Sequence, residues 1–286
     1  MKMPFLIQMG SNRLIRGDYF PAKKQVMANL IISHGYKGFK DWGFFPYAAD
    51  QLSAEANVIT FNFSHNGIGE QTGEFSELEK FATNTYSKEL EDLGALVRLV
   101  TEGGLPIDPS VYDGASSAKL PLILLGHSRG AGVSLIQAFD RPGQIAGVIS
   151  WNGVTNLDIF SAEEKQTMRD KGRAFVINAR TKQQMPLDVV ILEDMEANRD
   201  RFDIIGRAPA FKTPIVLVQG TEDFERLKMG STRLLHVRPE TQYVPIAGGN
   251  HTFNTVHPFQ GETEALREAI RASSDFIRDV ASGISE

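Results

Sequence analysis

Residues 122–133 read Leu-Ile-Leu-Leu-Gly-His-Ser-Arg-Gly-Ala-Gly-Val and join an apolar run to a run of small residues through a single serine. A continuous apolar run is typical of a strand that is buried on both faces of a parallel sheet. The small and apolar residues after the serine favour a helix that continues to Phe139. The glycines on either side of Ser128 fit the pattern G-x-S-x-G, whose modest specificity is raised by this strand-to-helix context. The stretch therefore predicts an α/β protein that presents Ser128 at a sharp turn.

The same alternation of short apolar runs and amphipathic stretches extends over most of the chain, as in βα units around a mainly parallel sheet. Strands are expected at residues 4–9, 13–20, 28–33, 57–63, 120–125, 145–151, 214–220 and 241–246, the first two forming an antiparallel hairpin. Helices are expected at residues 45–56, 86–101, 126–139, 226–237 and 263–280. These elements predict a mostly parallel eight-stranded sheet with helices on both faces.

The alternation breaks between the sixth and the seventh of these strands. Residues 156–173 are charge-rich and favour a helix, and a small hairpin is expected next, with strands at 175–177 and 189–191. We interpret residues 153–209 as a cap insertion that covers one end of the sheet. The remaining residues, 1–152 and 210–286, are expected to form the core domain.

The composition of the 286 residues limits the classes of partner. Hydrophobic residues make up 42% of the chain and charged residues 23%, as in ordinary globular proteins. The net charge is −5 without a basic stripe, so we expect no nucleic-acid partner, because phosphate binding needs clustered Lys and Arg. The chain has no cysteine, which excludes disulfides and thiolate catalysis, and its six histidines form no H-E-x-x-H pair. We therefore expect neither a metal ion nor another cofactor.

The lengths of the apolar runs bear on where the protein resides in the cell. The apolar run within Met1 to Gly10 is too short and too soon interrupted for a signal peptide, and no later apolar run is long enough to span a bilayer. The expectation is a cytoplasmic protein without membrane insertion. The sequence leaves the oligomeric state open between a monomer and a homodimer.

A catalytic serine needs a base, because its hydroxyl is a weak nucleophile until the proton is taken. His251 ends the stretch Ala-Gly-Gly-Asn-His at residues 247–251, where a loop between the last strand and the last helix would bring it to the sheet edge near Ser128. His257 lies in the same loop and stays open as an alternative base. His236 falls within an expected helix, which favours a surface position.

The acid that would orient such a histidine is expected after the strand that precedes the last one. The turn Thr221-Glu222-Asp223 follows that strand, and both carboxylates could reach the histidine. Asp223 fits the usual pattern Gly-x-x-Asp, and Glu222 remains an alternative. The role of the acid would be to hold the histidine tautomer and to stabilise the imidazolium ion.

A second turn could bind a developing negative charge on a substrate oxygen. His34-Gly35-Tyr36-Lys37-Gly38 follows the third expected strand, and glycine there would let the backbone approach the substrate. The backbone N–H of Tyr36 is then expected to face the N–H of Arg129 in an oxyanion hole.

On these four motifs, and across nearly its whole length, the chain resembles the α/β-hydrolase superfamily. The most similar pattern is that of dienelactone-hydrolase-like and prolyl-oligopeptidase-like serine hydrolases, including bacterial cinnamoyl and feruloyl esterases. The resemblance implies the α/β-hydrolase fold and a triad of Ser128, Asp223 and His251. Two features depart from the family pattern. Residues 61–67, Phe-Asn-Phe-Ser-His-Asn-Gly, stand where an Arg-Gly-His-Gly loop is common, and Arg129, whose side chain could bias substrate choice, replaces a more usual apolar residue or Gln.

The resemblance implies hydrolysis of a small-molecule carboxylic ester through an acyl-enzyme on Ser128. Amide, peptide or thioester hydrolysis and acyl transfer would use the same triad, and a non-catalytic binding protein of this fold is a further alternative. Trp42, Phe160 and Met168 are candidates for the wall of a substrate pocket, although such residues equally fit the core of the cap or ordinary helix packing. An apolar wall would suit small to medium acyl groups, aromatic ones included.

Overall fold

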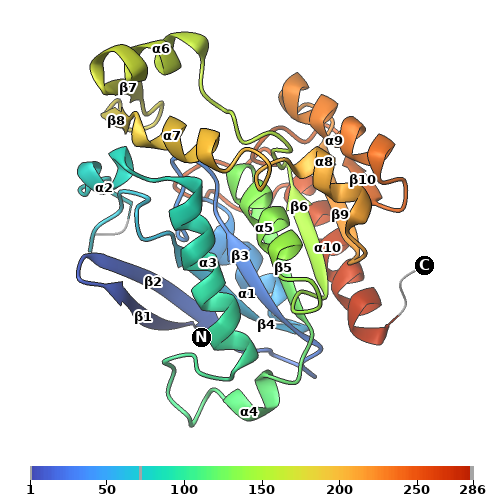
Figure 1. The fold of residues 1–286 in the computed structure, drawn as a ribbon. Coiled ribbons are helices and arrows are strands. Elements are labelled where there is room, and N and C mark those ends of the chain that lie inside the picture. The colour runs from blue at the N-terminus through green and yellow to red at the C-terminus, as the bar shows by residue number, and fades with distance from the viewer. Residues whose placement is uncertain (1, 71–72, 284–286) are drawn as a thin grey trace.

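The computed structural model describes residues 2–70 and 73–283, and a twisted eight-stranded sheet forms its centre (Figure 1). The strands of this sheet are β1 (Met3–Gly10), β2 (Arg13–Phe20), β3 (Ala28–Ser33), β4 (Ala56–Asn62), β5 (Leu122–His127), β6 (Gly147–Trp151), β9 (Ile215–Gly220) and β10 (Gln242–Ile246). Their spatial order is β1-β2-β4-β3-β5-β6-β9-β10. Strand β2 pairs antiparallel with β1 and with β4, and every other pair is parallel. The predicted mostly parallel eight-stranded sheet is confirmed.

The burial of the strands explains why their sequences are so apolar. Every residue of β3, β4, β5, β6 and β9 is buried, because helices cover both faces of the sheet. Edge strand β1 instead shows mainly exposed or half-buried side chains. The carboxyl ends of the parallel strands meet at one edge of the sheet, and ligands bind at this edge in open α/β sheets.

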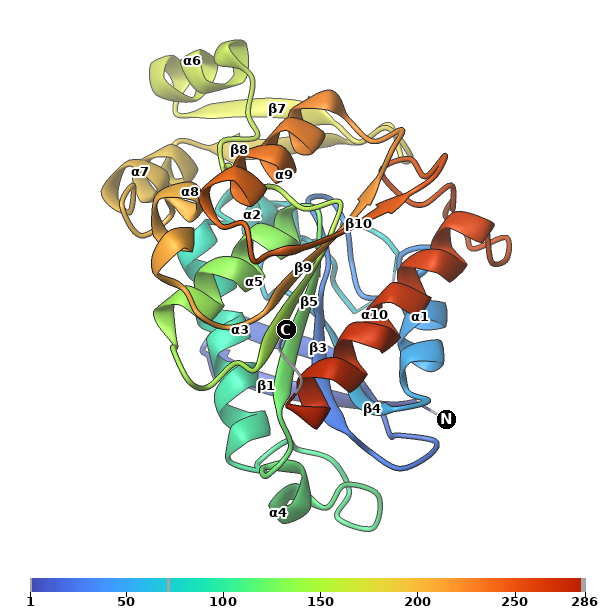
Figure 2. The same cartoon turned by 90° about the vertical axis from the view of Figure 1, so that its right-hand side faces the viewer.

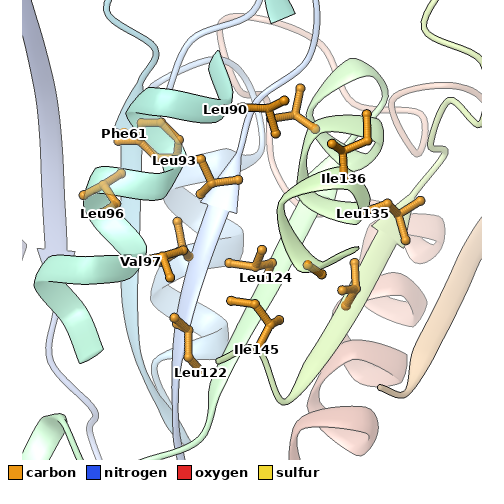
Figure 3. Packing of buried hydrophobic residues seen from close by; sticks show 14 of the residues in the cluster. Phe61, Leu90, Leu93, Leu96, Val97, Leu122, Leu124, Leu135, Ile136 and Ile145 are labelled. Carbon is orange, nitrogen blue, oxygen red and sulfur yellow. The ribbon is translucent and has the colours of Figure 1, made fainter. Parts of the chain in front are cut away.

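The helices of the core divide between the two faces of the sheet (Figure 2). They are α1 (Phe45–Leu52), α2 (Leu78–Ala82), α3 (Tyr86–Thr101), α4 (Gly114–Ser117), α5 (Arg129–Asp140), α8 (Ile204–Arg207), the 3₁₀ turn η1 (Ala208–Ala210), α9 (Glu225–Val237) and α10 (Glu264–Ser282). Helices α1 and α10 pack on one face, and α3, α5 and α9 pack on the other. In Figure 3, Leu93 and Val97 of α3 lie against Leu124 of β5. Among the described residues, no helix is both long and apolar enough to cross a membrane.

The segment that interrupts the alternation forms a small layer above the carboxyl edge of the sheet (Figure 1). It contains α6 (Ala162–Lys171), the hairpin of β7 (Arg173–Ile177) and β8 (Gln184–Asp188), and α7 (Val190–Ala197). Helix α6 begins at a capping box, in which Ser161 and Glu164 bond each other's backbone N–H, and ends at Gly172 with φ 77°.

The hairpin is confirmed, but the prediction of its second strand at residues 189–191 is wrong. That strand lies at 184–188, and Val189 leads into α7. The spacing of Ile191, Leu192 and Met195 puts three apolar side chains on one helical face, against the cluster that also holds Phe81 of α2. The boundaries of the cap at 153 and 209 stay a prediction.

Candidate active site

Ser128 occupies a sharp turn between β5 and α5, as the motif predicted. Its backbone has φ 55° and ψ −119°, a strained conformation for a residue with a side chain. The flanking glycines allow the turn because other backbone atoms come very close. A Cβ on Gly126 would lie 2.3 Å from the carbonyl oxygen of Gly130, and one on Gly130 would lie 2.4 Å from that of Ser33. Both positions therefore exclude any residue larger than glycine.

The structure brings Ser128, His251 and Asp223 together in one hydrogen-bonded series. The Ser128 hydroxyl lies 3.0 Å from Nε2 of His251, and Nδ1 of His251 lies 2.8 Å from Oδ1 of Asp223. Because a carboxylate only accepts hydrogen bonds, the proton of the neutral ring is on Nδ1 and Nε2 faces the serine. Asp223 is buried, and its oxygens also accept from the backbone N–H of Phe224 and the side chain of Gln219, both at 2.7 Å.

The other candidates for the acid and the base do not take part in these hydrogen bonds. The side chain of Glu222 is exposed and forms no hydrogen bond with a described residue, while its backbone N–H donates to the carbonyl of Gly249. His257 accepts from the backbone N–H of Gly43 at 2.9 Å and stacks on Trp42. His236 is exposed on α9. None of the three is part of the series that contains Ser128.

Two residues that the sequence analysis did not single out hold the loop of His251 in place. Asn152 donates from Nδ2 to the carbonyls of Asn250 and His251, both at 3.1 Å, and accepts from the backbone N–H of Gly220 at 2.7 Å. His127 donates from Nε2 to the carbonyl of His251 at 2.8 Å. Burial and the nearby His251 ring lower the pKa of His127 to about 3, so its ring is neutral. Both residues stand at strand ends on the edge that carries Ser128, and that position is the signal that could have identified them.

The turn after β3 lies directly against Ser128. A Cβ on Gly35 would come within 3.0 Å of the Cβ of Ser128, so glycine is needed for this approach. His34 fixes the turn, because its Nδ1 donates to the carbonyl of Gly35 at 3.0 Å while its Nε2 accepts from the backbone N–H of Phe63 at 3.3 Å. Burial lowers the pKa of His34 to about 4, which keeps the ring in this neutral form.

The two backbone donors expected for an oxyanion hole adjoin this contact. Tyr36 follows Gly35, and Arg129 is the first residue of α5, where helix N–H groups lack intrahelical partners. Within residues 2–70 and 73–283, neither N–H donates a hydrogen bond. The positive end of the α5 dipole also points to the Ser128 turn, so the local field favours a negative charge there.

The side chain of Arg129 is buried in an ion pair, and whether it biases substrate choice stays a prediction. Its Nε pairs with Glu89 of α3 at 2.9 Å, and its guanidinium carbon lies 3.9 Å above the ring centre of Tyr86. Burial lowers the pKa of Arg129, but the Glu89 carboxylate together with the hydroxyls of Tyr86 and Tyr36 raises it on balance. The pair joins α5 to α3 next to the turn that carries Ser128.

A cavity of about 550 Å³ opens beside Ser128 and His251, between the core and the cap. Its lining comprises Tyr36, Lys37, Ser128, Arg129, Val154, Ile159, Phe160, Glu164, Phe175, Val176, Ile177, Phe224, Arg226 and His251. Of the expected pocket residues, Phe160 lies in the wall. Trp42 packs against Phe44 and His257, and Met168 is buried within the cap. Among the described residues, no three or more His, Asp or Glu side chains gather where they could hold a metal ion.

The chain is similar to known proteins in sequence over less than half of its length and in structure over nearly all of it. No protein-family model matches the sequence. A monoglyceride lipase homolog of monkeypox virus is 29% identical over 131 residues, which are 46% of this chain and 40% of the viral protein, so less than half of that protein is matched.

Solved structures match over a much larger part of the chain. Est1E from Butyrivibrio proteoclasticus has a TM-score of 0.69 at 13% identity and covers 98% of this chain and 99% of its own. Mouse alpha/beta hydrolase domain-containing protein 10 has a TM-score of 0.68 at 18% identity, covering 97% and 99%. The monoacylglycerol lipase of Paleococcus ferrophilus has a TM-score of 0.64 at 14% identity, covering 93% and 99%. Because these similarities extend over nearly the whole sheet and its helices, the predicted fold is confirmed, and the protein has the fold of the α/β hydrolases.

Proposed function

We propose that this protein is a serine hydrolase that cleaves carboxylic esters of small molecules. The observation that carries the proposal is the continuous series of hydrogen bonds from Asp223 through His251 to Ser128. This series opens onto a cavity large enough for a small substrate, with an apolar wall that includes Phe160 and Phe175.

Each group in the series has a defined task in the proposed reaction. His251 takes the hydroxyl proton as Oγ of Ser128 bonds to the acyl carbon, and the backbone N–H groups of Tyr36 and Arg129 bind the oxyanion. The ester bond then breaks, and the alcohol leaves with the proton from His251. A water molecule, deprotonated by His251, hydrolyses the acyl-enzyme, which releases the carboxylic acid and restores Ser128. Asp223 holds the Nδ1 proton and stabilises the imidazolium ion throughout.

An ester is favoured as the substrate class by the wall of the cavity and by the names of similar proteins. The apolar side chains in the wall of the cavity, among them Val154, Ile159 and Phe160, suit an acyl chain or an aromatic acid. Est1E has been solved with bound ferulic acid, and two other matches are named as monoglyceride or monoacylglycerol lipases.

The test is covalent labelling combined with turnover. The protein is incubated with a fluorophosphonate probe, its intact mass is measured, and the labelled peptide is sequenced. We expect one adduct at Ser128 and turnover of p-nitrophenyl esters or cinnamates. Ser128→Ala should lose both, while Ser110→Ala, at an exposed serine of the loop before α4, should keep both. An unlabelled Ser128 together with no turnover across the ester panel would leave a binding protein as the better interpretation.

A further inference from the structure

Two further cavities adjoin the cavity beside Ser128 in a row, since neighbouring cavities share wall residues, and we call this row the cleft. A second cavity, of about 190 Å³, shares Val154, Ile159 and Arg226 with the wall of the catalytic cavity. A third, of about 480 Å³, shares Thr155 and Arg233 with the second. All three cavities follow the chain segment 154–159, which leads from β6 into the cap.

Along this cleft the carboxylates have partners, whereas three of the arginines have none among the described residues. The carboxylates in its walls are all engaged: Asp158 pairs with Lys165, Glu196 pairs with Arg169, and Asp203 and Glu164 cap the starts of α8 and α6. In contrast, Arg199, Arg226 and Arg233 form no ion pair with any described carboxylate and no side-chain hydrogen bond in the described chain. Among the described residues that line the three cavities, four cations have no ion pair (Lys37, Arg199, Arg226 and Arg233) against two carboxylates without one (Glu164 and Asp203), so the cleft keeps an excess of positive charge.

Two of these arginines stand at the junctions between cavities. Arg226, near the start of α9, borders both the catalytic cavity and the second cavity. Arg233, two helical turns further along α9, borders the second and the third. Positions seven apart lie on nearly the same face of a helix, so both arginines present their charge along the line of the cleft.

We propose, on the basis of the proposed esterase function, that the preferred substrate is an ester with a second, negatively charged group, which Arg226 and Arg233 bind. The ester would lie at Ser128, an apolar linker would pass Val154 and Ile159, and the anionic group would reach the arginines. Guanidinium groups suit this task because they bind carboxylates and phosphates through two parallel hydrogen bonds.

The experiment compares esters that differ only in charge. For the acyl side, mono-p-nitrophenyl suberate is paired with p-nitrophenyl octanoate; for the alcohol side, 4-carboxyphenyl octanoate is paired with phenyl octanoate. We expect kcat/KM to favour the charged ester of at least one pair by about three- to tenfold, since both arginines are exposed and their attraction is screened. The preference should shrink at 0.5 M salt.

Variants identify the residues responsible. The double variant Arg226→Gln/Arg233→Gln should bring the charged-to-neutral ratio close to one, and Arg226→Glu/Arg233→Glu should reverse it. Arg271→Gln, at an exposed arginine of α10 away from the cleft, should leave the ratio and the rates unchanged. A ratio of one in both pairs for the unmodified protein, or a preference that survives in the double variants, would overturn the proposal. Absence of turnover for all four esters together with no fluorophosphonate labelling would instead overturn the esterase function itself.

Discussion

Asp223 is held by three donors, which leaves its carboxylate little freedom to turn. Oδ1 accepts from His251 and from the backbone N–H of Phe224, and Oδ2 accepts from Gln219. Gln219 is itself held by Ser231 at 2.8 Å. The orientation of the His251 ring is therefore fixed from below by a network that reaches from β9 into α9.

This network predicts that Asp223, and not Glu222, orients His251 in the proposed reaction. Asp223→Asn would place an amide N–H against His251 and favour the wrong tautomer, so we expect kcat to fall by about 10⁴-fold with little loss of folded protein. Glu222→Gln, one position away and exposed, should change kcat by less than about twofold. The measurement is steady-state kinetics on one p-nitrophenyl ester. A large loss at Glu222 and a small one at Asp223 would assign the acid to the other carboxylate.

The buried pair of Arg129 and Glu89 leads to a prediction about stability. Arg129→Met keeps the backbone N–H and most of the side-chain volume, but among the described side chains it leaves the buried Glu89 carboxylate with the Asn84 amide alone as a partner. We expect the free energy of unfolding to fall by about 3–5 kcal/mol, measured by urea denaturation. Adding Glu89→Leu should recover part of this loss. If the single variant is as stable as the unmodified protein, the pair does not tie α3 to α5 energetically.

The sequence predicted individual residues where a motif limits the choice. Ser128 follows from its glycines, because only a glycine-flanked turn of this kind fits between a buried strand and a helix. The acid stayed open because Glu222 lies in the same turn as Asp223 and could also reach the histidine; the folded turn buries Asp223 against His251 and leaves Glu222 exposed. Asn152 and His127 were missed because their hydrogen bonds join chain segments about 100 residues apart or more, so that only their position at strand ends marks them in the sequence.

At the scale of elements, the cap contributes apolar side chains to the cavity beside Ser128 without burying them. Phe175 and Ile177 alternate along β7, line the cavity and are 56% and 54% exposed. The strand is fixed to the core from its other end, where Arg173 bonds Glu79 of α2 at 2.7 Å and Asp188 of β8. Because these side chains are exposed, they can contact a substrate. Replacing them should therefore cost little folding stability.

Replacing these side chains should therefore affect substrate binding more than stability. For Phe175→Ser and Ile177→Ser we expect KM for p-nitrophenyl octanoate to rise by about fivefold, because apolar contact with the acyl chain is lost. The free energy of unfolding should change by less than about 0.5 kcal/mol. Leu6→Ser, at a similarly exposed position of β1 far from the cap, is the matched control. Unchanged KM in both cap variants would place the acyl chain elsewhere.

The ends of an element were predictable where its apolar periodicity stops at a polar residue or a glycine. The strand at 28–33 and the helix at 86–101 have the predicted ends, because apolar periodicity stops where polar or glycine residues begin. The second cap strand was misplaced because Val189-Val190-Ile191 has a high strand propensity, whereas packing onto the core selects a helix there. Tertiary contacts overrode local preference in the segment with the least regular sequence.

At the scale of the whole molecule, buried neutral histidines make stability depend on pH. The pKa values of His34 and His127 are lowered by burial to about 4 and about 3, below the ordinary value of 6.5. The unfolded chain therefore takes up protons below about pH 6.5 that the folded chain does not bind. The stability due to each neutral ring is fully present above this pH and is lost as pH falls toward the folded pKa.

We expect the free energy of unfolding to fall below pH 6.5 by about 1.4 kcal/mol per pH unit for each of these two histidines. Urea denaturation at pH 7.5, 6.5 and 5.5 measures the slope. His127→Gln should lower stability at pH 7.5 and flatten the slope by the share of one histidine. A stability that stays constant from pH 7.5 to 5.5 would contradict the assigned neutral states.

The order of the strands along the chain has a consequence for synthesis on the ribosome. Ser128 is translated 123 residues before His251, and the strands that carry the acid and the base, β9 and β10, are the last to be added at one edge of the sheet. Until that edge is complete, Ser128 is an ordinary alcohol with no base beside it. If Ser128 acts as proposed, the growing polypeptide would be unable to attack esters until the final strands dock.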